Sequence, residues 1–193
     1  MPELIFDLHS WARPSDAVDE MVLDRCIGPT LDVGCGPGRM VMALAARGIP
    51  ALGIDLAPEA VRAVRAAGGL ALERSIFGPL PGEGRWPVAL LLDGCLGIGG
   101  SPLSLLTRLA EVLAPDGVVY VEHDPDPDRA EITTATVVDL GGRGGGSFPW
   151  AIIGLRQLES ASRAAGLRIA ESWTVEQRAF AALRPRRWEE YDT

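Results

Sequence analysis

The stretch TLDVGCGPGRM, from Thr30 to Met40, decides the fold of this chain. A short apolar run ends in an acid, Asp32, then glycines follow at alternate positions and a helical pattern begins. This order predicts a buried strand, a tight turn and a helix N-terminus, where a bound molecule can approach bare backbone. Glycine is needed where the turn requires unusual dihedral angles or where a Cβ would block the ligand. We therefore expect a cofactor site at this turn.

Strands and helices alternate on the C-terminal side of this stretch. The expected strands are Thr30–Val33, Ala51–Ile54, Leu70–Glu73, Val88–Leu92 and Val118–Glu122, with helices over 38–47, 58–67 and 101–113. Val88–Leu92 is continuously apolar, which is typical of a central parallel strand buried on both faces. The alternation predicts a doubly wound, Rossmann-like α/β fold with a mostly parallel sheet. Leu167–Val175 and Ala179–Leu183 are expected to add an antiparallel pair at its edge.

Two further segments flank this core, and we expect one domain over residues 1–193. An N-terminal cap helix within residues 1–28, capped by Ser15 or Asp16, either lies over the cofactor cleft as a lid or packs on the sheet. Residues 124–150 form an insertion with a strand or hairpin arm at Glu131–Leu140 and a glycine hinge at 141–146. At the carboxyl ends of the strands it would cover a substrate; the alternative is a surface loop. A helix is predicted over Ile152–Ala165.

Composition excludes several classes of protein. The formal net charge of −8 disfavours nucleic acid and anionic membranes, although Arg184, Arg186 and Arg187 form a small basic patch. Cys26, Cys35 and Cys95 lack the spacing of metal ligands and fit reduced thiols better than disulfides. There is no apolar run of about 20 residues and no secretion signal, so we expect a cytoplasmic protein without a bound metal.

The glycine spacing distinguishes two adenosine-containing cofactors. Asp55 ends the next strand 21 residues after Gly34, the distance at which an acid accepts hydrogen bonds from a ribose diol. A dinucleotide site requires Gly-x-Gly-x-x-Gly, whereas here the third glycine, Gly38, comes one residue early and the sixth position is Arg39. Pro37 also removes an amide that a phosphate could use. A dinucleotide-dependent oxidoreductase is therefore disfavoured.

The string LDVGCGPGR resembles the first motif of class I S-adenosylmethionine-dependent methyltransferases, Asp/Glu-x-Gly-x-Gly-x-Gly. GIDLAPEAV at 53–61 resembles their second segment, and the Leu-Ala-Pro-Asp-Gly turn at 113–117 resembles the one before their fifth strand. The resemblance covers Leu31 to Glu122, and the composition is similar to that of small actinobacterial-type members. It implies a seven-stranded sheet and S-adenosylmethionine as the cofactor.

The resemblance also implies roles for individual residues. Asp32 would reach the cofactor's amino group, and Asp55 would accept from both ribose hydroxyls with Leu56 beside the adenine. The residues expected to bring backbone against the methionyl part are Gly34, Cys35, Gly36 and Gly38. The family often has an acid after the third strand, but this chain has Arg74-Ser75-Ile76-Phe77 there, so adenine contact falls to Ser75, Ile76 and Phe77.

Candidate catalytic and substrate residues follow the later strands. Asp93 ends the fourth strand, and either touches cofactor and substrate or caps the glycine-rich turn. His123, between two acids, is either a general base or a partly exposed loop histidine. The residues placed near the substrate are Trp11, Arg13, Cys95, His123 and Trp150, although a packing role is the alternative for Trp11 and a structural one for Cys95.

The sequence thus predicts transfer of a methyl group from S-adenosylmethionine to a small molecule, which specialised metabolism could supply. The alternative is a protein that binds S-adenosylmethionine without transferring its methyl group. The sequence identifies neither the acceptor atom nor the oligomeric state.

Overall fold

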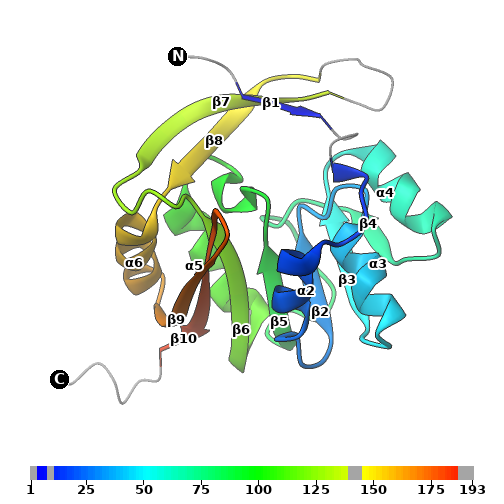
Figure 1. Ribbon diagram of the computed structural model, residues 1–193, viewed down its shortest axis with the longest axis horizontal. Helices are drawn as coiled ribbons and strands as arrows, with labels where there is room; N and C mark the ends of the chain where they lie inside the picture. The colour runs from blue at the N-terminus through cyan, green and yellow to red at the C-terminus, as the bar shows by residue number, and fades with distance from the viewer. Residues whose placement is uncertain (1–3, 8–10, 139–144, 187–193) are drawn as a thin grey trace.

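A seven-stranded sheet lies at the centre of the computed structural model, which describes residues 4–7, 11–138 and 145–186 (Figure 1). In order across the sheet, the strands are β4 (Ala71–Glu73), β3 (Ala51–Asp55), β2 (Thr30–Val33), β5 (Trp86–Leu91), β6 (Leu113–His123), β10 (Arg178–Pro185) and β9 (Leu167–Val175). Neighbours from β4 to β6 are parallel, whereas β10 is antiparallel to both β6 and β9. The predicted fold class and antiparallel edge pair are confirmed.

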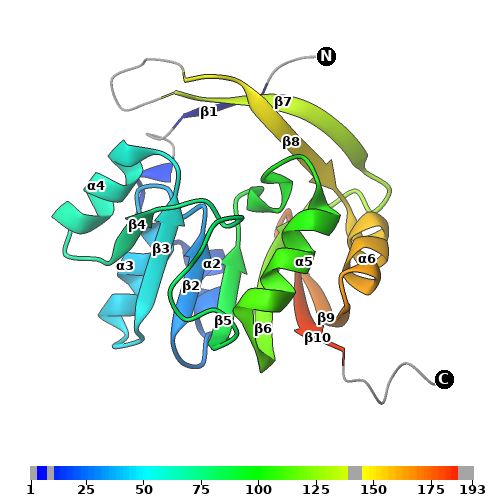
Figure 2. The ribbon, with the colours of Figure 1, turned by 180° about the vertical axis from the view of Figure 1, so that it is seen from behind.

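Helices cover both faces of the sheet (Figures 1 and 2). The helices α2 (Ala17–Leu23), α3 (Arg39–Ala46) and α4 (Pro58–Ala66) lie on one face, and α5 (Pro102–Val112) and α6 (Leu155–Ala164) lie on the other. Asp16 begins α2 with a capping box, in which its side chain accepts from the amide of Asp19 and the Asp19 carboxylate accepts in return. Because Val18, Val22 and Leu23 are buried in the core, this helix packs on the sheet and is not a lid.

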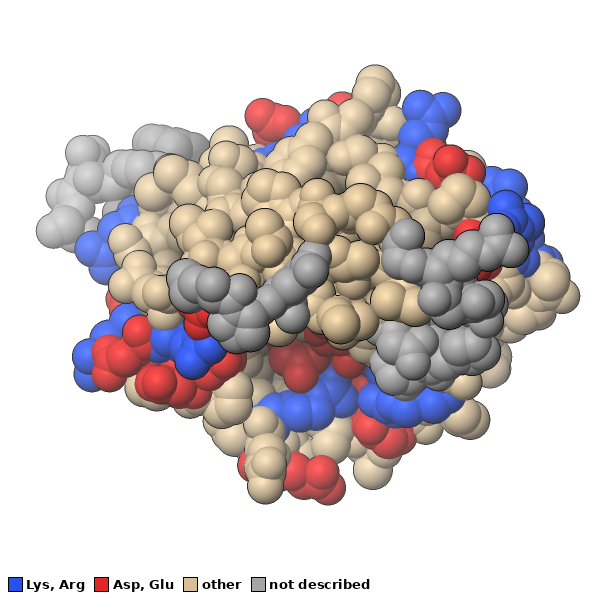
Figure 3. Space-filling view, turned by 90° about the horizontal axis from the view of Figure 1, so that it is seen from above, with Lys and Arg blue, Asp and Glu red and all other residues tan. Residues whose placement is uncertain are grey.

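A second, three-stranded sheet lies across the carboxyl ends of the central strands (Figure 1). Its strands, which we call the roof, are β1 (Leu4–Asp7), β7 (Ala130–Val138) and β8 (Phe148–Ile153). β7 pairs in parallel with β1 and antiparallel with β8. Seen from above, uncharged side chains occupy the middle of the roof and most charged ones lie toward the rim (Figure 3).

The roof corrects two expectations from the sequence. The helix predicted over Ile152–Ala165 begins only at Leu155, because Phe148–Ile153 pairs along β7 as a strand. Residues 4–7, for which no element was predicted, form β1 because their backbone pairs with residues 135–138 of β7. The hairpin arm predicted at Glu131–Leu140 is present as β7, while residues 141–144 of the expected hinge lie outside the described residues.

One predicted turn also differs. The Pro115–Gly117 turn lies within β6, which starts at Leu113, and its irregularity is a shift of register against β5 between Trp86 and Val88. Within the part of the chain that the structure describes, no helix is both long and apolar enough to cross a membrane.

Candidate functional site

A cavity of about 590 Å³ lies between the carboxyl edge of the sheet and the roof. Loops after β2, β3, β4 and β5 form its floor, in accordance with the position of ligands in doubly wound sheets. From the sheet side, it is lined by Asp32–Gly36, Ile54–Ala57, Arg74–Phe77, Leu92, Asp93, Cys95, Ile98 and Gly99. From the roof, from α3 and from the chain before α2, it is lined by Phe6, Trp11, Arg39, Met40, Val137, Gly146 and Phe148–Trp150.

The glycine turn after β2 is held against the end of β3 by the Asp55 carboxylate. The amide of Gly36 donates to Asp55 Oδ2 at 2.9 Å, and the amide of Ala57 donates to Oδ1 at 2.8 Å. Gly34, Gly36 and Gly38 all have positive φ, which explains why the turn needs glycine. A carboxylate offers about four lone-pair sites, so Asp55 keeps acceptor capacity toward the cavity. This is the arrangement that a pair of vicinal hydroxyls would fit.

Asp32 is a buried carboxylate that faces the same cavity. It is 4% exposed, and among the described residues no hydrogen-bond donor or ion-pair partner reaches its side chain. Burial raises the pKa of Asp32 to about 7, and the nearby negative charges of Asp93 and Asp55 add to the effect that Arg39 opposes. A buried carboxylate without a partner is costly, and a cationic ligand group would relieve that cost. The buried Asp32 carboxylate therefore fits a cofactor that carries positive charge.

The segment after β4 supplies an apolar border to the cavity. Leu56 and Phe77 line it and are 68% and 46% exposed, unusually high values for large apolar side chains. Ile76 is buried, and the Ser75 hydroxyl accepts a hydrogen bond from the amide of Phe77. These residues lie where the sequence places adenine contacts, and two of them offer exposed apolar surface there.

Asp93 lines the cavity just after β5, next to Gly94, whose added Cβ would lie 3.9 Å from the Trp150 ring of the roof. The φ of Asp93, 53°, is in the left-handed region, a strained conformation for a residue other than glycine. The amide of Asp93 donates to Glu122 Oε2 at 2.8 Å, and Arg39 donates to its carboxylate. Burial raises the pKa of Asp93, although the charge of Arg39 acts in the opposite direction. Strain and a displaced pKa together are typical of functional positions.

Glycines after Asp93 allow the roof to approach closely. A Cβ on Gly97 would lie 2.3 Å from the Ala151 carbonyl oxygen and 2.4 Å from Trp150 Nε1. One on Gly100 would lie 2.7 Å from the side chain of Pro149. We call residues 94–100 the glycine strip, which is the surface on which β8 rests.

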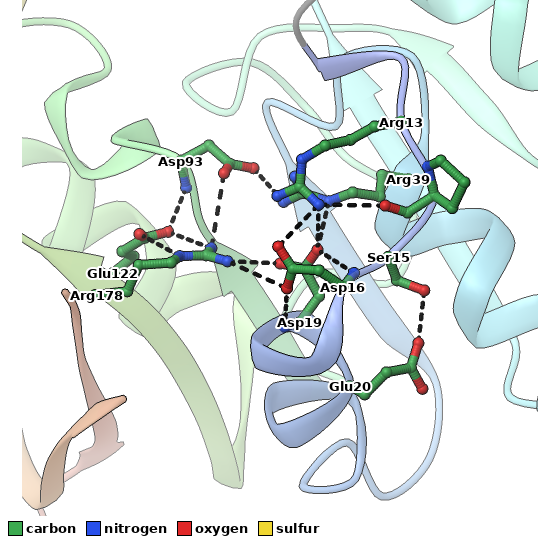
Figure 4. A network of polar contacts seen from close by, with 10 residues as sticks. Arg13, Ser15, Asp16, Asp19, Glu20, Arg39, Asp93, Glu122 and Arg178 are labelled. Carbon is green, nitrogen blue, oxygen red and sulfur yellow. Dashed lines mark hydrogen bonds and ion pairs between the residues drawn. The ribbon is translucent and has the colours of Figure 1, made fainter. Parts of the chain in front are cut away.

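A buried network of charges fixes Asp93 from behind (Figure 4). Arg39 pairs with Asp93 and, through Nε, with Asp19 Oδ2 at 3.1 Å. Arg178 donates to Glu122 at 2.8 Å and to Asp19 Oδ1 at 2.8 Å. Although burial alone would raise the pKa of Asp19, the hydrogen bond from Arg178 and the charge of Arg39 hold that pKa below its usual value. The network joins α2, α3, β6 and β10 to the end of β5.

Several residues predicted for the site lie on the cavity, and three do not. Trp11, Cys95 and Trp150 line it, as do the cofactor candidates apart from Gly38. A Cβ on Gly38 would lie 2.5 Å from Val64, so this glycine serves the packing of α3 on α4. Arg13 is outside the cavity lining because its guanidinium pairs with Asp16 and Asp19.

His123 is also outside the cavity lining. Side chains alternate along a strand, and Glu122 faces Asp93 and Arg178, which directs its neighbour to the other face. The ring Nδ1 of His123 lies 2.9 Å from the Asp124 carbonyl oxygen. His123, one predicted catalytic residue, is thus not among the residues that line the cavity, whereas Asp93, the other, is.

Sequence reasoning missed other residues of the site. Phe6, Met40 and Phe148 line the cavity from the roof and α3. Arg39 entered the sequence argument only as a departure from dinucleotide spacing, and its partner Asp93 is 54 residues away. The glycine-rich segment after Asp93 was the one available signal of a close approach by another part of the chain.

A family model described as a methyltransferase domain matches residues 10–172. Among curated proteins, none matches the chain.

Solved structures share the fold at low sequence identity. An S-adenosylmethionine-dependent methyltransferase from Bacteroides fragilis, in complex with S-adenosyl-L-homocysteine, is 20% identical with a TM-score of 0.72, covering 90% of this chain and 78% of its own. A 1,6-didemethyltoxoflavin-N1-methyltransferase from Burkholderia thailandensis is 19% identical with a TM-score of 0.67, covering 89% and 78%. A sugar N-methyltransferase from Streptoalloteichus is 17% identical with a TM-score of 0.65, covering 88% and 85%. These likenesses establish the fold.

Proposed function

The chain belongs to the methyltransferase domain family, and on that basis we propose that it transfers a methyl group from S-adenosylmethionine to a small molecule beneath the roof. The observation that carries the proposal is one continuous cavity. It joins the Asp32 and Asp55 carboxylates to the apolar underside of the roof. A site of this size, enclosed by side chains, suits a cofactor and a small acceptor together.

Asp55 and Asp32 would hold the cofactor through its ribose and its positive charge. The Asp55 carboxylate is oriented by two backbone amides, so its free lone pairs can accept from vicinal hydroxyls. Asp32 has unmet demand for a cation, and Leu56 and Phe77 present exposed apolar surface to a flat ring. Solved relatives in this fold hold S-adenosylmethionine or S-adenosylhomocysteine according to their descriptions, which supports the same cofactor here.

When bound, the cofactor supplies a methyl group on a sulfonium, which a nucleophile can attack directly. The chain's own contribution is then orientation and proton removal. Fixing the acceptor against the methyl donor can supply about 7–11 kcal/mol in favourable cases. Asp93, at the boundary between the glycine turn and the roof, would accept the proton that the acceptor releases. The net charge of −8 favours a small acceptor over a nucleic acid.

Replacing Asp55 tests the cofactor assignment. We expect Asp55→Ala to weaken binding of S-adenosylmethionine about 100-fold in titration calorimetry, because hydrogen bonds to a charged group contribute about 1.5–3 kcal/mol each. Glu73→Ala is the matched control, since Glu73 also ends a strand of the sheet but does not line the cavity. Unchanged affinity in Asp55→Ala would contradict the assignment.

Methyl-labelled cofactor tests the transfer itself. Incubation with a small-molecule extract, followed by mass analysis, should place label on a compound of low molecular mass. If cofactor binds but no fraction acquires label, the protein binds S-adenosylmethionine without transferring its methyl group.

A further inference from the structure

Among the described residues, the acceptor half of the cavity is lined mainly by apolar side chains, which restricts the class of acceptor. This half comprises the side chains that come from the roof, α3, the chain before α2 and the glycine strip. Its apolar members are Phe6, Trp11, Met40, Ile98, Val137, Phe148, Pro149 and Trp150. An acceptor that lies among them contacts aromatic rings and aliphatic groups on most of its surface.

The aromatic side chains form one connected wall. The ring of Phe6 lies 4.7 Å from that of Trp150 and 5.3 Å from that of Trp11, measured between centroids. The ring of Phe148 extends the wall, with its centroid 5.9 Å from Trp150. The rings are tilted or edge-on to one another, with interplanar angles of 40°, 62° and 68°, so together they present a continuous aromatic surface on which a ring of a ligand can pack.

Among the described residues, the charged side chains at this half are Arg39 and, just before the glycine strip, Asp93. Trp11 and Trp150 add one indole N–H donor each, and Cys95 adds a thiol, which is a weak donor. The Arg39 guanidinium is already engaged by Asp19 and Asp93, and its side chain is 5% exposed. The Asp93 side chain is 30% exposed, so its carboxylate can accept one further hydrogen bond from a ligand. Among the described residues these few polar side chains are outnumbered by apolar ones, so a molecule with many hydroxyls would bury some of them against apolar surface, which costs affinity.

We propose that the acceptor is a flat, apolar ring compound with a single nucleophilic hydroxyl or amine that faces Asp93, and not a sugar. This inference rests on the proposed function of the cavity. The acceptor oxygen or nitrogen forms the new bond to the methyl carbon while the carbon–sulfur bond breaks and its electron pair stays on sulfur. The proton of the hydroxyl or amine goes to the Asp93 carboxylate.

Binding of defined probes to the protein loaded with S-adenosylhomocysteine tests the acceptor class. The probes are 2-naphthol and 1-naphthylamine, with glucosamine and methyl glucoside as sugars of one ring. We expect calorimetry to show that at least one naphthalene probe binds tenfold or more tightly than either sugar. With methyl-labelled S-adenosylmethionine, label should pass to that probe and not to the sugars.

Two phenylalanine variants separate the halves of the cavity. Phe148→Ala should weaken binding of the naphthalene probe at least fivefold while leaving S-adenosylhomocysteine affinity within twofold. Phe77→Ala, at the border on the sheet side, should do the reverse. Phe148→Leu keeps apolar volume in the roof and guards against a variant that fails to fold.

The outcomes distinguish this inference from the proposed function. If S-adenosylhomocysteine binds but a sugar binds as tightly as the naphthalene probes, or no naphthalene probe binds, the acceptor class is wrong and the cofactor site stands. If S-adenosylhomocysteine does not bind to the wild-type protein, the proposed function itself is wrong.

Discussion

We expect cofactor binding at Asp32 to release a proton. Its pKa of about 7 in the free protein means that about a tenth of the carboxyl is ionised at pH 6. A cationic group on the cofactor favours the ionised form, so binding releases a proton. We expect S-adenosylmethionine to bind about tenfold more weakly at pH 6 than at pH 8. Calorimetry in buffers of different ionisation enthalpy would detect the released proton.

The Asp32→Asn variant is the control for this effect. At pH 8 the variant should bind S-adenosylmethionine more weakly than the wild-type protein does. Its affinities at pH 6 and pH 8 should differ little. The folding stability of the free protein follows the opposite trend with pH. Because folding raises the pKa of Asp32, this carboxyl contributes its full stability below pH 3.8, and the contribution is lost as pH rises through about 7. A wild-type affinity that is the same at pH 6 and pH 8 would show that Asp32 does not meet the cofactor's charge.

Asp93 is the residue on which proton removal depends. Asp93→Asn keeps the shape of the side chain but removes its basicity, so the rate of methyl transfer should fall by about 10²–10⁴-fold. Because burial raises the pKa of Asp93, the wild-type rate should increase with pH above the range of an ordinary aspartate and then level off. In the variant this limb should be absent when the rate is measured at saturating cofactor, so that a change in cofactor affinity does not contribute. A variant with the wild-type rate and pH profile would remove Asp93 as a base.

Among the elements, the glycine strip determines how β8 rests on the sheet. A Cβ on Gly97 meets a backbone carbonyl, which cannot rotate away as a flexible side chain can. We expect Gly97→Ala to lower the free energy of unfolding by about 1–3 kcal/mol, in line with other overpacked sites. Gly146→Ala is the matched control, because nothing lies within 4 Å of the added Cβ.

Denaturant unfolding of the two glycine variants gives the comparison. The Gly97 variant should also lose affinity for acceptor probes, since β8 carries Phe148 and Trp150 into the cavity. Equal stability of the two variants would mean that the roof moves away from the strip at no cost.

The same elements show what the sequence can and cannot predict. The units from Thr30 to Glu122 are predictable because each strand, turn and helix is encoded by adjacent residues, as in Asp32, Gly34 and the helix that follows. β8 is not predictable in this way, since FPWAII followed by a helix reads as the start of that helix until β7 supplies a partner. Asp32 and Asp55 were found because their motif is local, whereas Arg39 matters through Asp93 and Asp19, which are distant in sequence.

At the scale of the whole molecule, the central sheet and the roof differ in how firmly they are held. The sheet is buried between two groups of helices, and the charge network ties α2 and β10 to the end of β5. Removing one partner of such a buried ion pair is destabilising. The central sheet and its helices therefore have little freedom to rearrange. The roof strands pair with one another, and isolated bridges from Ile98 to Trp150 and from Asp124 to Gly154 join the roof region to the loops that follow β5 and β6. We therefore expect an acceptor to enter by movement of the roof.

Hydrogen exchange tests this division of the molecule. In the free protein, amides of β7 and β8 should exchange faster than those of β5, because β5 is paired on both sides inside the central sheet, whereas the roof is a separate sheet joined to the loops after β5 and β6 by isolated bridges and by the contact of β8 with the glycine strip. S-adenosylhomocysteine and 2-naphthol, each at about 100 times its dissociation constant, should slow roof exchange by up to about 100-fold for each ligand that the open state cannot hold. Amides of α5, which packs on the face of the sheet opposite to α2, α3 and α4, should change their exchange on ligand binding only as far as global unfolding changes. Roof amides as protected as those of β5 in the free protein would mean that the acceptor enters by another route, and Trp11 at the side of the cavity would then be the position to replace.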